Sequence, residues 1–278
     1  MSHNPTKRWR ILAALAVLVM ILALLPALAA AQPAQTVPTP GPTILSPSSN
    51  PYGKTYGQWS VLWWQWAIKP KYSESALTDT NGSRCAIGQS GSVWFLAGVA
   101  NASGTVVRDC VVPSNVALFM PVLNYEMDEY GVPSPSHPSP YTPLEMRNIA
   151  ADIILNGTTG LYFTVDNVTL KEADLRATYR TQSSAFTYTM WAADNMYGIT
   201  CTPGFTPRCK DGSGKTVPFA LLTCSSAPNS RCTAIAYGDG YYVMLAPLSP
   251  GQHTLHFGGT FKGTPPYILD ITYHLTVQ

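Results

Sequence analysis

The chain has 278 residues, of which 46% are hydrophobic and only 12% are charged. Three of its 17 basic residues and none of its 15 acidic residues lie in the first 31 positions, so the remainder carries 14 basic and 15 acidic residues and a net charge of −1. This balance argues against a nucleic-acid partner, which would need a basic face. No basic cluster marks a lipid-binding surface either.

The N-terminal segment has the features of an export signal. A basic stretch, Lys7 to Arg10, precedes the apolar run Ile11–Leu25, and the small residues Ala29–Ala31 are suitable for cleavage before Gln32. We therefore expect residues 1–31 to be a signal peptide and the protein to be secreted or on the cell surface. The alternative is an uncleaved anchor, since the 21 residues 11–31 are long enough to span a bilayer. Membrane contact is expected only through that segment.

Residues 32–51 are rich in proline, serine and threonine. This composition predicts an extended linker. The sequence from residue 52 to residue 278 is then expected to form a single domain, because no internal repeat or second linker divides it.

The segment after the linker concentrates four of the seven tryptophans between residues 59 and 66. Thr55 and Gln58 form a capping-box pattern and Pro70 ends the segment, which predicts a helix of about 13 residues. One aromatic stripe follows spacings of three, four and three, at Tyr56, Trp59, Trp63 and Trp66. We expect this stripe to be buried against the rest of the domain, and we expect Trp64, which lies off it, to be exposed. A membrane-surface helix would carry Lys or Arg on its polar face, and none occurs from residue 58 to 68.

The remainder of the chain has mostly β patterns. Apolar or alternating segments predict strands at 92–99, 105–112, 116–123, 161–168, 185–190, 241–247, 253–257 and 269–277. A turn at 101–104 is expected to join the first two as a hairpin. A second helix is predicted at 143–155, where Thr142 and Glu145 form a capping box. The fold class is therefore mainly β, an antiparallel β-sandwich (jelly-roll-like) with one or two accessory helices.

Six cysteines lie after the leader, and an even number in an exported chain predicts disulfides. Cys85 and Cys110 flank the predicted hairpin, so we pair them. The other four lie in a loop-rich segment, residues 201–232. They pair either locally, Cys201–Cys209 and Cys224–Cys232, or in a nested arrangement, Cys201–Cys232 and Cys209–Cys224. A metal site is weakly indicated, because no Cys-x-x-Cys pair is present.

Two stretches carry a resemblance. They are "YGQWSVLWWQWAIKP" near the start of the domain and "DGYYVMLAPLSPGQHTLHFGGTF", followed by "YHLTV", at its end. With "GSVWFLAG" and "ALFMPVLN" between them, the chain resembles a family of exported bacterial proteins of unknown function, over residues 52–278. The resemblance implies export and a single domain, and it implies nothing about chemistry.

The acidic stretch "NYEMDEY", residues 124–130, is one candidate site. It follows a predicted strand, so we expect Glu126, Asp128 and Glu129 to lie in a loop. Such a loop is most often simply solvated. Its oxygens could also hold Ca²⁺, the one cofactor that the sequence suggests, or a carboxyl pair could act as acid and base in a secreted hydrolase.

A second candidate site consists of aromatic and polar residues that could bind a sugar, since aromatic rings stack on sugar faces and polar neighbours fix the hydroxyls. Its members are Trp64, Trp191, Asp194, Asn195 and Tyr241. The alternative is that these aromatics fill the core. Strand histidines are a third possibility for metal or base chemistry. His253 is expected to point inward and His256 and His274 outward, and such residues are more often structural.

No recognised catalytic or nucleotide-binding motif occurs in the chain. The sequence therefore favours a non-enzymatic extracellular or cell-surface protein with a structural or adhesive role. A carbohydrate-binding module is the first alternative and a secreted hydrolase using the 124–130 carboxylates is the second. The expected partners are an extracellular glycan or further copies of the chain.

Overall fold

A computed structural model describes residues 41–100, 103–128, 141–202, 208–217, 223–225 and 230–278. The described residues belong to one compact unit, Pro40–Gln278. The predicted signal peptide and the first part of the linker lie outside the described residues. Among the described residues, no helix has both the length and the apolar character needed to cross a membrane.

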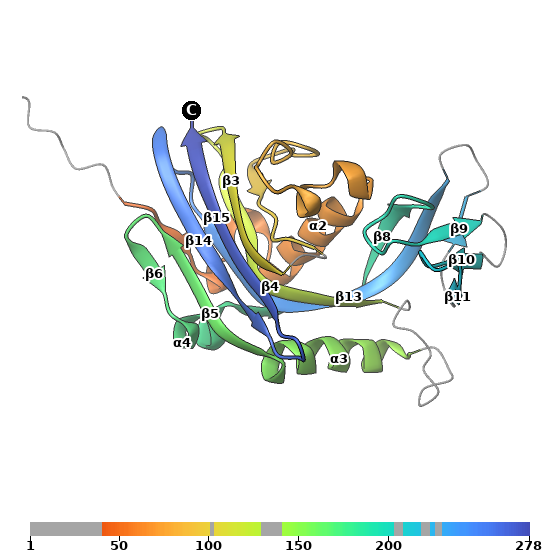
Figure 1. The fold of residues 1–278 in the computed structure, drawn as a ribbon. Helices are drawn as coiled ribbons and strands as arrows, with labels where there is room; N and C mark the ends of the chain where they lie inside the picture. Colours follow the sequence, from red (N-terminus) through yellow and green to blue (C-terminus); the bar gives the residue numbers. More distant parts are fainter. Residues whose placement is uncertain (1–40, 101–102, 129–140, 203–207, 218–222, 226–229) are drawn as a thin grey trace, which may run out of the picture. The chain divides into compact units, whose positions relative to one another are not determined.

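This unit is mainly β, as the sequence predicts, with two large sheets in a sandwich-like arrangement (Figure 1). The first sheet runs in the order β1 (Ile44–Leu45), β13 (Arg231–Leu245), β4 (Ala117–Asp128) and β2 (Val93–Phe95). Three short strands also pair with β13, namely β7 (Arg180–Gln182), β8 (Phe186–Trp191) and β12 (Thr223–Cys224). The second sheet runs in the order β3 (Gly104–Val112), β15 (Tyr267–Val277), β14 (Gly251–Phe261), β5 (Thr158–Val165) and β6 (Val168–Leu170).

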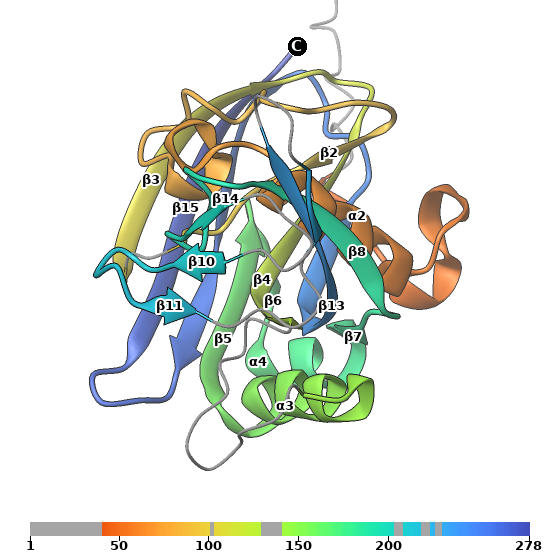
Figure 2. The same ribbon diagram turned by 90° about the vertical axis from the view of Figure 1, so that its right-hand side faces the viewer.

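A small third sheet forms in the cysteine-rich segment (Figure 2). It consists of β11 (Thr216–Val217), β10 (Arg208–Lys210) and β9 (Thr200–Thr202). Disulfides join Cys201 to Cys209 and Cys224 to Cys232, and a third joins Cys85 to Cys110. The local pairing is therefore the one formed. Each of the two local disulfides links residues directly opposite one another on neighbouring antiparallel strands.

The sheets are mixed rather than wholly antiparallel. β2 pairs in parallel with β4, and β3 pairs in parallel with β15. The predicted hairpin between residues 92–99 and 105–112 is wrong, because its two strands lie in different sheets. The predicted jelly-roll-like topology does not include these parallel pairs. The paired strands are distant in sequence, so local turn signals could not predict them.

The tryptophan helix is α2 (Tyr56–Ile68), and its capping box between Thr55 and Gln58 is formed. The predicted stripe is buried, and three of its indole N–H groups donate to backbone carbonyls: Trp59 to Pro51, Trp63 to Leu96 and Trp66 to Ile87. The prediction that Trp64 is exposed is wrong, since only 6% of its surface is accessible. α2 contacts β4, β7, β8 and β13, so a second side of the helix is also covered.

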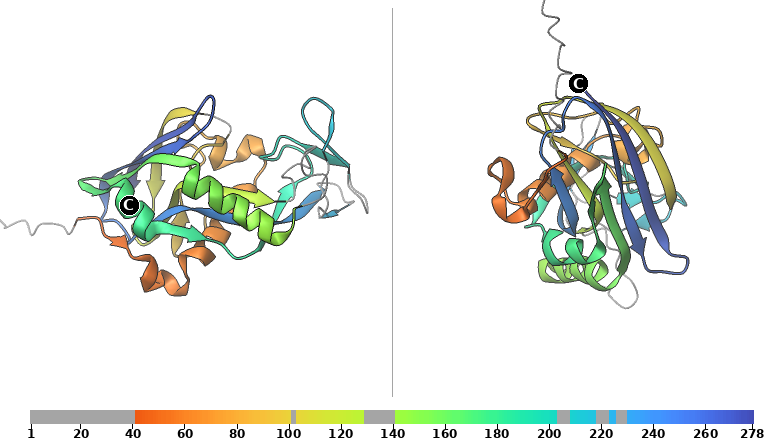
Figure 3. Two further views of the ribbon diagram at one scale, coloured as in Figure 1. Left: turned by 90° about the horizontal axis from the view of Figure 1, so that it is seen from below. Right: turned by 90° about the vertical axis from the view of Figure 1, so that its left-hand side faces the viewer.

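The second predicted helix is α3 (Pro143–Asn156), with the capping box of Thr142 and Glu145 in place. Seen from below in Figure 3, it crosses β4 and β13, and Met146 and Ala150 pack against Met127 and Tyr237. The shorter helices are η1 (Pro47–Ser49), η2 (Pro51–Gly53), η3 (Tyr72–Glu74), η4 (Ala76–Thr78), α4 (Glu172–Asp174) and η5 (Leu175–Tyr179). Because β1 pairs with β13, the end of the predicted linker is part of the fold.

Candidate functional site

The acidic stretch continues strand β4 instead of forming a loop. Pairing with β13 extends to Asp128, which lies opposite Ala236, so the predicted loop is wrong up to that residue. Asp128 is buried, with 3% of its surface exposed, and the solvated interpretation is wrong for it. Glu129 lies outside the described residues. Side chains alternate along a strand, so Glu126 and Asp128 share one face while Met127 packs with α3 on the other.

Glu126 and Asp128, here called the carboxyl pair, lie among tyrosines. The Tyr197 hydroxyl donates to Oε1 of Glu126 at 2.7 Å, and the Tyr188 hydroxyl donates to Oδ2 of Asp128. The two tyrosine rings are in contact, with centroids 5.9 Å apart. The second oxygen of Glu126, Oε2, is buried and has no hydrogen-bond partner. A buried acceptor of this kind is costly unless a partner occupies the site.

The surroundings of Glu126 favour its protonated form. Burial, and then the neighbouring Asp128, raise the pKa of Glu126 well above its ordinary value, although the hydrogen bond from Tyr197 opposes them. Burial also raises the pKa of Tyr188 and of Tyr197, and the carboxyl pair raises both further. The tyrosine hydroxyls therefore remain donors to the carboxyl groups.

A cavity of about 550 Å³ lies beside this network, along the edge of β4. β2 covers that edge only from Ala117 to Phe119, and beyond these residues no described strand pairs with it. The cavity, here called the edge pocket, has mainly apolar walls that include Trp63, Trp64, Leu77, Val99, Ala100, Leu123, Asn124, Met196, Phe261, Lys262, Tyr267 and Leu269. Two wall residues adjoin the network: Asn124 precedes Glu126 on the same strand face, and Met196 precedes Tyr197.

Trp64 is a wall residue of the edge pocket, and its indole lies against Gly238. A Cβ atom added at Gly238 would lie 2.8 Å from its Nε1 atom, so only glycine leaves room for the ring at that position. Gly238 is the residue opposite Glu126 in the β4–β13 pairing. Nε1 of Trp64 is buried and faces the Tyr242 hydroxyl without a hydrogen bond of normal geometry. The wall of the pocket thus includes a buried indole N–H without a hydrogen bond of normal geometry.

The predicted sugar-binding residues are not brought together. Trp191 lines a separate groove of about 600 Å³ beside α2. Asp194 binds Ser73 through its carboxylate, while the amide of Asn195 bonds to the backbone of its own turn. Tyr241 is completely buried and accepts a hydrogen bond from Arg176. With Trp64 in the edge pocket, the five residues lie in several different environments.

The histidines do not form a cluster, and each binds a different aspartate. His253 binds Asp166, His256 binds Asp270 and His274 binds Asp109. His253 is the least exposed of the three, in agreement with its predicted inward direction.

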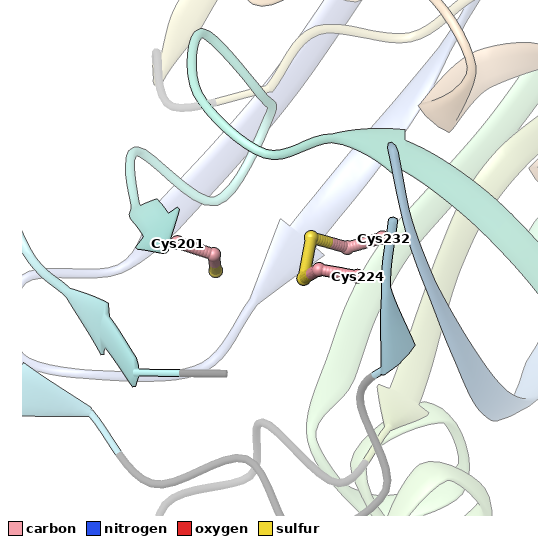
Figure 4. Close-up of side chains that lie close together, drawn as sticks. All are labelled: Cys201, Cys224 and Cys232. Atoms are coloured by element: carbon pink, nitrogen blue, oxygen red, sulfur yellow. A yellow bond between two sulfur atoms is a disulfide. The ribbon is translucent and has the colours of Figure 1, made fainter. Parts of the chain in front are cut away.

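The sulfur atoms of Cys201, Cys224 and Cys232 lie within 4.8 Å of one another (Figure 4). All three belong to disulfides. They therefore offer no thiolate for a metal in this state. Ca²⁺ binding by the carboxyl pair and Glu129 remains a prediction from the sequence.

Sequence reasoning selected Glu126 and Asp128 and missed Tyr188, Tyr197 and Asn124. One signal was present: Asn124, Glu126 and Asp128 alternate with apolar or aromatic residues directly after an apolar strand, as expected if the strand continues. Tyr188 and Tyr197 follow Glu126 by 62 and 71 residues in the chain. Only the pairing of β13 with both β4 and β8 brings Tyr188 to Asp128.

Comparison with known proteins adds no relative to this description. No family model, no curated protein and no solved structure matches the chain.

Proposed function

We propose that this chain is an exported, non-enzymatic binding protein that takes a small ligand with an apolar body into the edge pocket. One observation carries the proposal: a mainly apolar cavity of about 550 Å³ whose wall includes Trp64, with a buried indole N–H that makes no hydrogen bond of normal geometry, and the polar side chain of Asn124. Small-molecule sites have this size and this combination of apolar walls with a few polar groups. The three disulfides are typical of proteins in oxidising compartments and support export.

The geometry favours binding over the other roles that the sequence suggests. A hydrolase would need both carboxyl groups to reach one substrate position. Asp128 is buried and one of its oxygens is held by Tyr188, so Glu126 alone has a free oxygen. A purely structural or adhesive role does not account for an apolar cavity of this size with a buried indole N–H in its wall.

Glycan binding is a second candidate, and the groove beside α2 favours it. Trp191 is partly exposed there, and Gln65, Lys69 and Arg231 supply polar groups. The Arg231 guanidinium lies 3.5 Å from the Trp191 ring centroid and covers one face of the ring. A sugar could therefore use only the remaining surface of the ring. This restriction places glycan binding second.

The neutral fluorescent probe 1-aminoanthracene tests the proposal by titration into the purified protein. We expect saturable binding, and we expect Ala100→Trp to weaken it at least tenfold because the new ring fills the edge pocket. Ala177→Trp, at an exposed position in η5, is the matched control and should change the affinity less than twofold. Equal affinities for the two variants would contradict the proposal. A rise in the unfolding midpoint with a glycan alone would favour the second candidate.

A further inference from the structure

We propose that the two disulfides of the segment 201–232 form a thiol–disulfide exchange site. At this site an external thiol converts the local pairing into the nested pairing, Cys201–Cys232 and Cys209–Cys224. The inference goes beyond the proposed binding function and does not depend on the edge pocket. It is carried by the position of one disulfide directly beside the other.

The sulfur of Cys201 lies next to a disulfide to which it does not belong. Its Sγ atom and those of Cys224 and Cys232 all lie within 4.8 Å of one another (Figure 4). Cys209, the disulfide partner of Cys201, is not part of this group of three sulfur atoms. A thiolate exchanges with a disulfide by attacking one of its sulfur atoms directly, so only a small movement separates Cys201 from exchange with the neighbouring disulfide.

Backbone hydrogen bonds hold Cys201 at this position. Its N–H donates to the Ala192 carbonyl at 2.7 Å, and the Ala192 N–H donates to the carbonyl of Ser230, at 2.9 Å, just before β13 and Cys232. The side-chain amide of Asn195 donates to two carbonyls of the turn that joins β8 to β9. The sulfur atoms therefore lie together because of the fold around them, and their proximity does not depend on the disulfides alone.

The exchange conserves electrons and the number of sulfur–sulfur bonds. An incoming thiolate attacks Cys224, the most exposed of the four cysteines. It forms a mixed disulfide there, and the electron pair of the broken bond stays on Cys232. The Cys232 thiolate attacks Cys201, forms the Cys201–Cys232 bond and releases Cys209 as a thiolate. Cys209 then attacks Cys224, forms the second nested bond and releases the incoming thiol unchanged.

The exchange changes which strands are joined covalently. In the local pairing one disulfide joins β9 to β10 inside the small third sheet, and the other joins β12 to β13 in the first sheet. In the nested pairing β9 is joined to β13 and β10 to β12. Both nested bonds therefore link the small sheet to the first sheet, a covalent connection that neither local bond makes.

Two variants test the geometry, because each frees one sulfur of the same disulfide. Cys209→Ser frees Cys201 beside the Cys224–Cys232 disulfide, whereas Cys201→Ser frees Cys209, which lies outside the group of three sulfur atoms. Each purified variant is kept at pH 8, its free thiols are blocked with N-ethylmaleimide, and its disulfide-linked tryptic peptides are identified by mass spectrometry. Trypsin separates the four cysteines, because basic residues lie between them: Arg208, Lys210, Lys215 and Arg231.

We expect exchanged disulfides mainly in the variant that frees Cys201. Cys209→Ser should contain at least about five times more disulfide from Cys201 to Cys224 or Cys232 than Cys201→Ser contains from Cys209 to those residues. The matched control is thus the other half of the same disulfide.

The unmodified chain gives a second measurement that does not depend on the folding of a variant. Treated with a catalytic amount of reduced glutathione, it should yield the Cys201–Cys232 peptide, and without glutathione it should yield only the local pairs. The Cys85–Cys110 disulfide is the internal control and should stay intact in every sample.

Equal amounts of exchanged disulfide in the two variants would overturn the inference, because the position of the free sulfur would then not matter. A Cys209→Ser variant that keeps only Cys224–Cys232 would also overturn it, and so would an unmodified chain that shows only the local pairs after glutathione treatment. If a variant also loses Cys85–Cys110 it is unfolded, and the result for the unmodified chain decides.

Discussion

Two buried carboxyl groups in this molecule, those of Asp79 and Glu126, have pKa values shifted in opposite directions. Burial alone would raise the pKa of Asp79, but backbone N–H groups, among them those of Arg84 and Asn81, and the charge of Arg108 outweigh it and hold the pKa below its ordinary value. Glu126 has no such set of donors, and burial together with Asp128 raises its pKa well above the ordinary value. The surroundings thus favour the ionised form of the carboxyl group at Asp79 and the protonated form at Glu126.

The difference separates a structural site from a candidate binding site. Arg108 beside Asp79 is completely buried, and it donates to the Asp79 and Ala97 carbonyls and to the Tyr273 hydroxyl. Except for Nη2 of Arg108, which is also buried without a partner, the polar atoms named here have partners from the chain itself, and these contacts hold the loop that precedes β2 against β3 and β15. At Glu126 the chain leaves an acceptor open. A buried acceptor that the chain leaves without a partner is a candidate contact for a molecule that binds to the protein.

The largest effect is expected at the structural site. Arg108→Met keeps much of the side-chain length but removes the donor to the buried Asp79 carbonyl and the positive charge beside the Asp79 carboxylate, so we expect it to lower the free energy of unfolding by about 3–5 kcal/mol. Urea denaturation at pH 7 measures this change. Lys69→Met, at an exposed position, removes the same charge and should change stability by less than about 0.5 kcal/mol. A loss below about 1 kcal/mol for Arg108→Met would show that the Asp79 region does not depend on this charge.

The helices were predictable because their signals are local. In both α2 and α3 the capping box lies within four residues, and the aromatic spacing of α2 fixes its buried side. The strand partners were not predictable in the same way, since the parallel pairing of β3 with β15 joins residues about 165 positions apart. Apolar alternation identifies a strand and gives no information about its neighbour.

The candidate site was only half predictable for the same reason. Glu126 and Asp128 stood out by composition, but their burial depends on β13, whose partner segment lies more than 100 residues later in the sequence. Trp64 was expected to be exposed because it lies off the stripe of α2. It is buried because Gly238 on β13 leaves room for its ring. That contact depends on a glycine whose importance no local pattern reveals.

An intermediate effect is expected at Glu126, where substitution should raise the free energy of unfolding instead of lowering it. A carboxyl group whose pKa is higher in the folded state destabilises the fold as the pH rises above about 4.3, the unfolded value for Glu. Glu126→Gln removes this term. The variant should therefore gain stability relative to the parent between pH 5 and pH 8, by up to about 1.4 kcal/mol for each unit of the shift that lies inside this window.

Urea denaturation at pH 5 and at pH 8 measures that gain. Subtracting the change in unfolding free energy at pH 5 from that at pH 8 removes any effect of the amide that does not depend on pH. The same substitution at an exposed carboxyl group, Glu74→Gln, should show no gain. If Glu126→Gln lost stability equally at pH 5 and pH 8, Glu126 would be ionised and satisfied, and the contrast with Asp79 would disappear.

The smallest effect is expected at Asp270, which is partly exposed on β15. Hydrogen bonds from Thr105 and Tyr162, together with His256, lower the pKa of Asp270 to about 2. A depressed carboxyl pKa stabilises the fold above the unfolded value of about 3.9, and this stability is lost as the pH falls toward 2. Because solvent screens the group, we expect Asp270→Asn to cost no more than about 1 kcal/mol at pH 6 and less at pH 3. Asp109→Asn, on the neighbouring strand β3, provides the matched control for the loss of one charge. A cost for Asp270→Asn that does not decrease between pH 6 and pH 3 would mean that the partners of this carboxyl group, unlike those of Asp79, do not act through its charge.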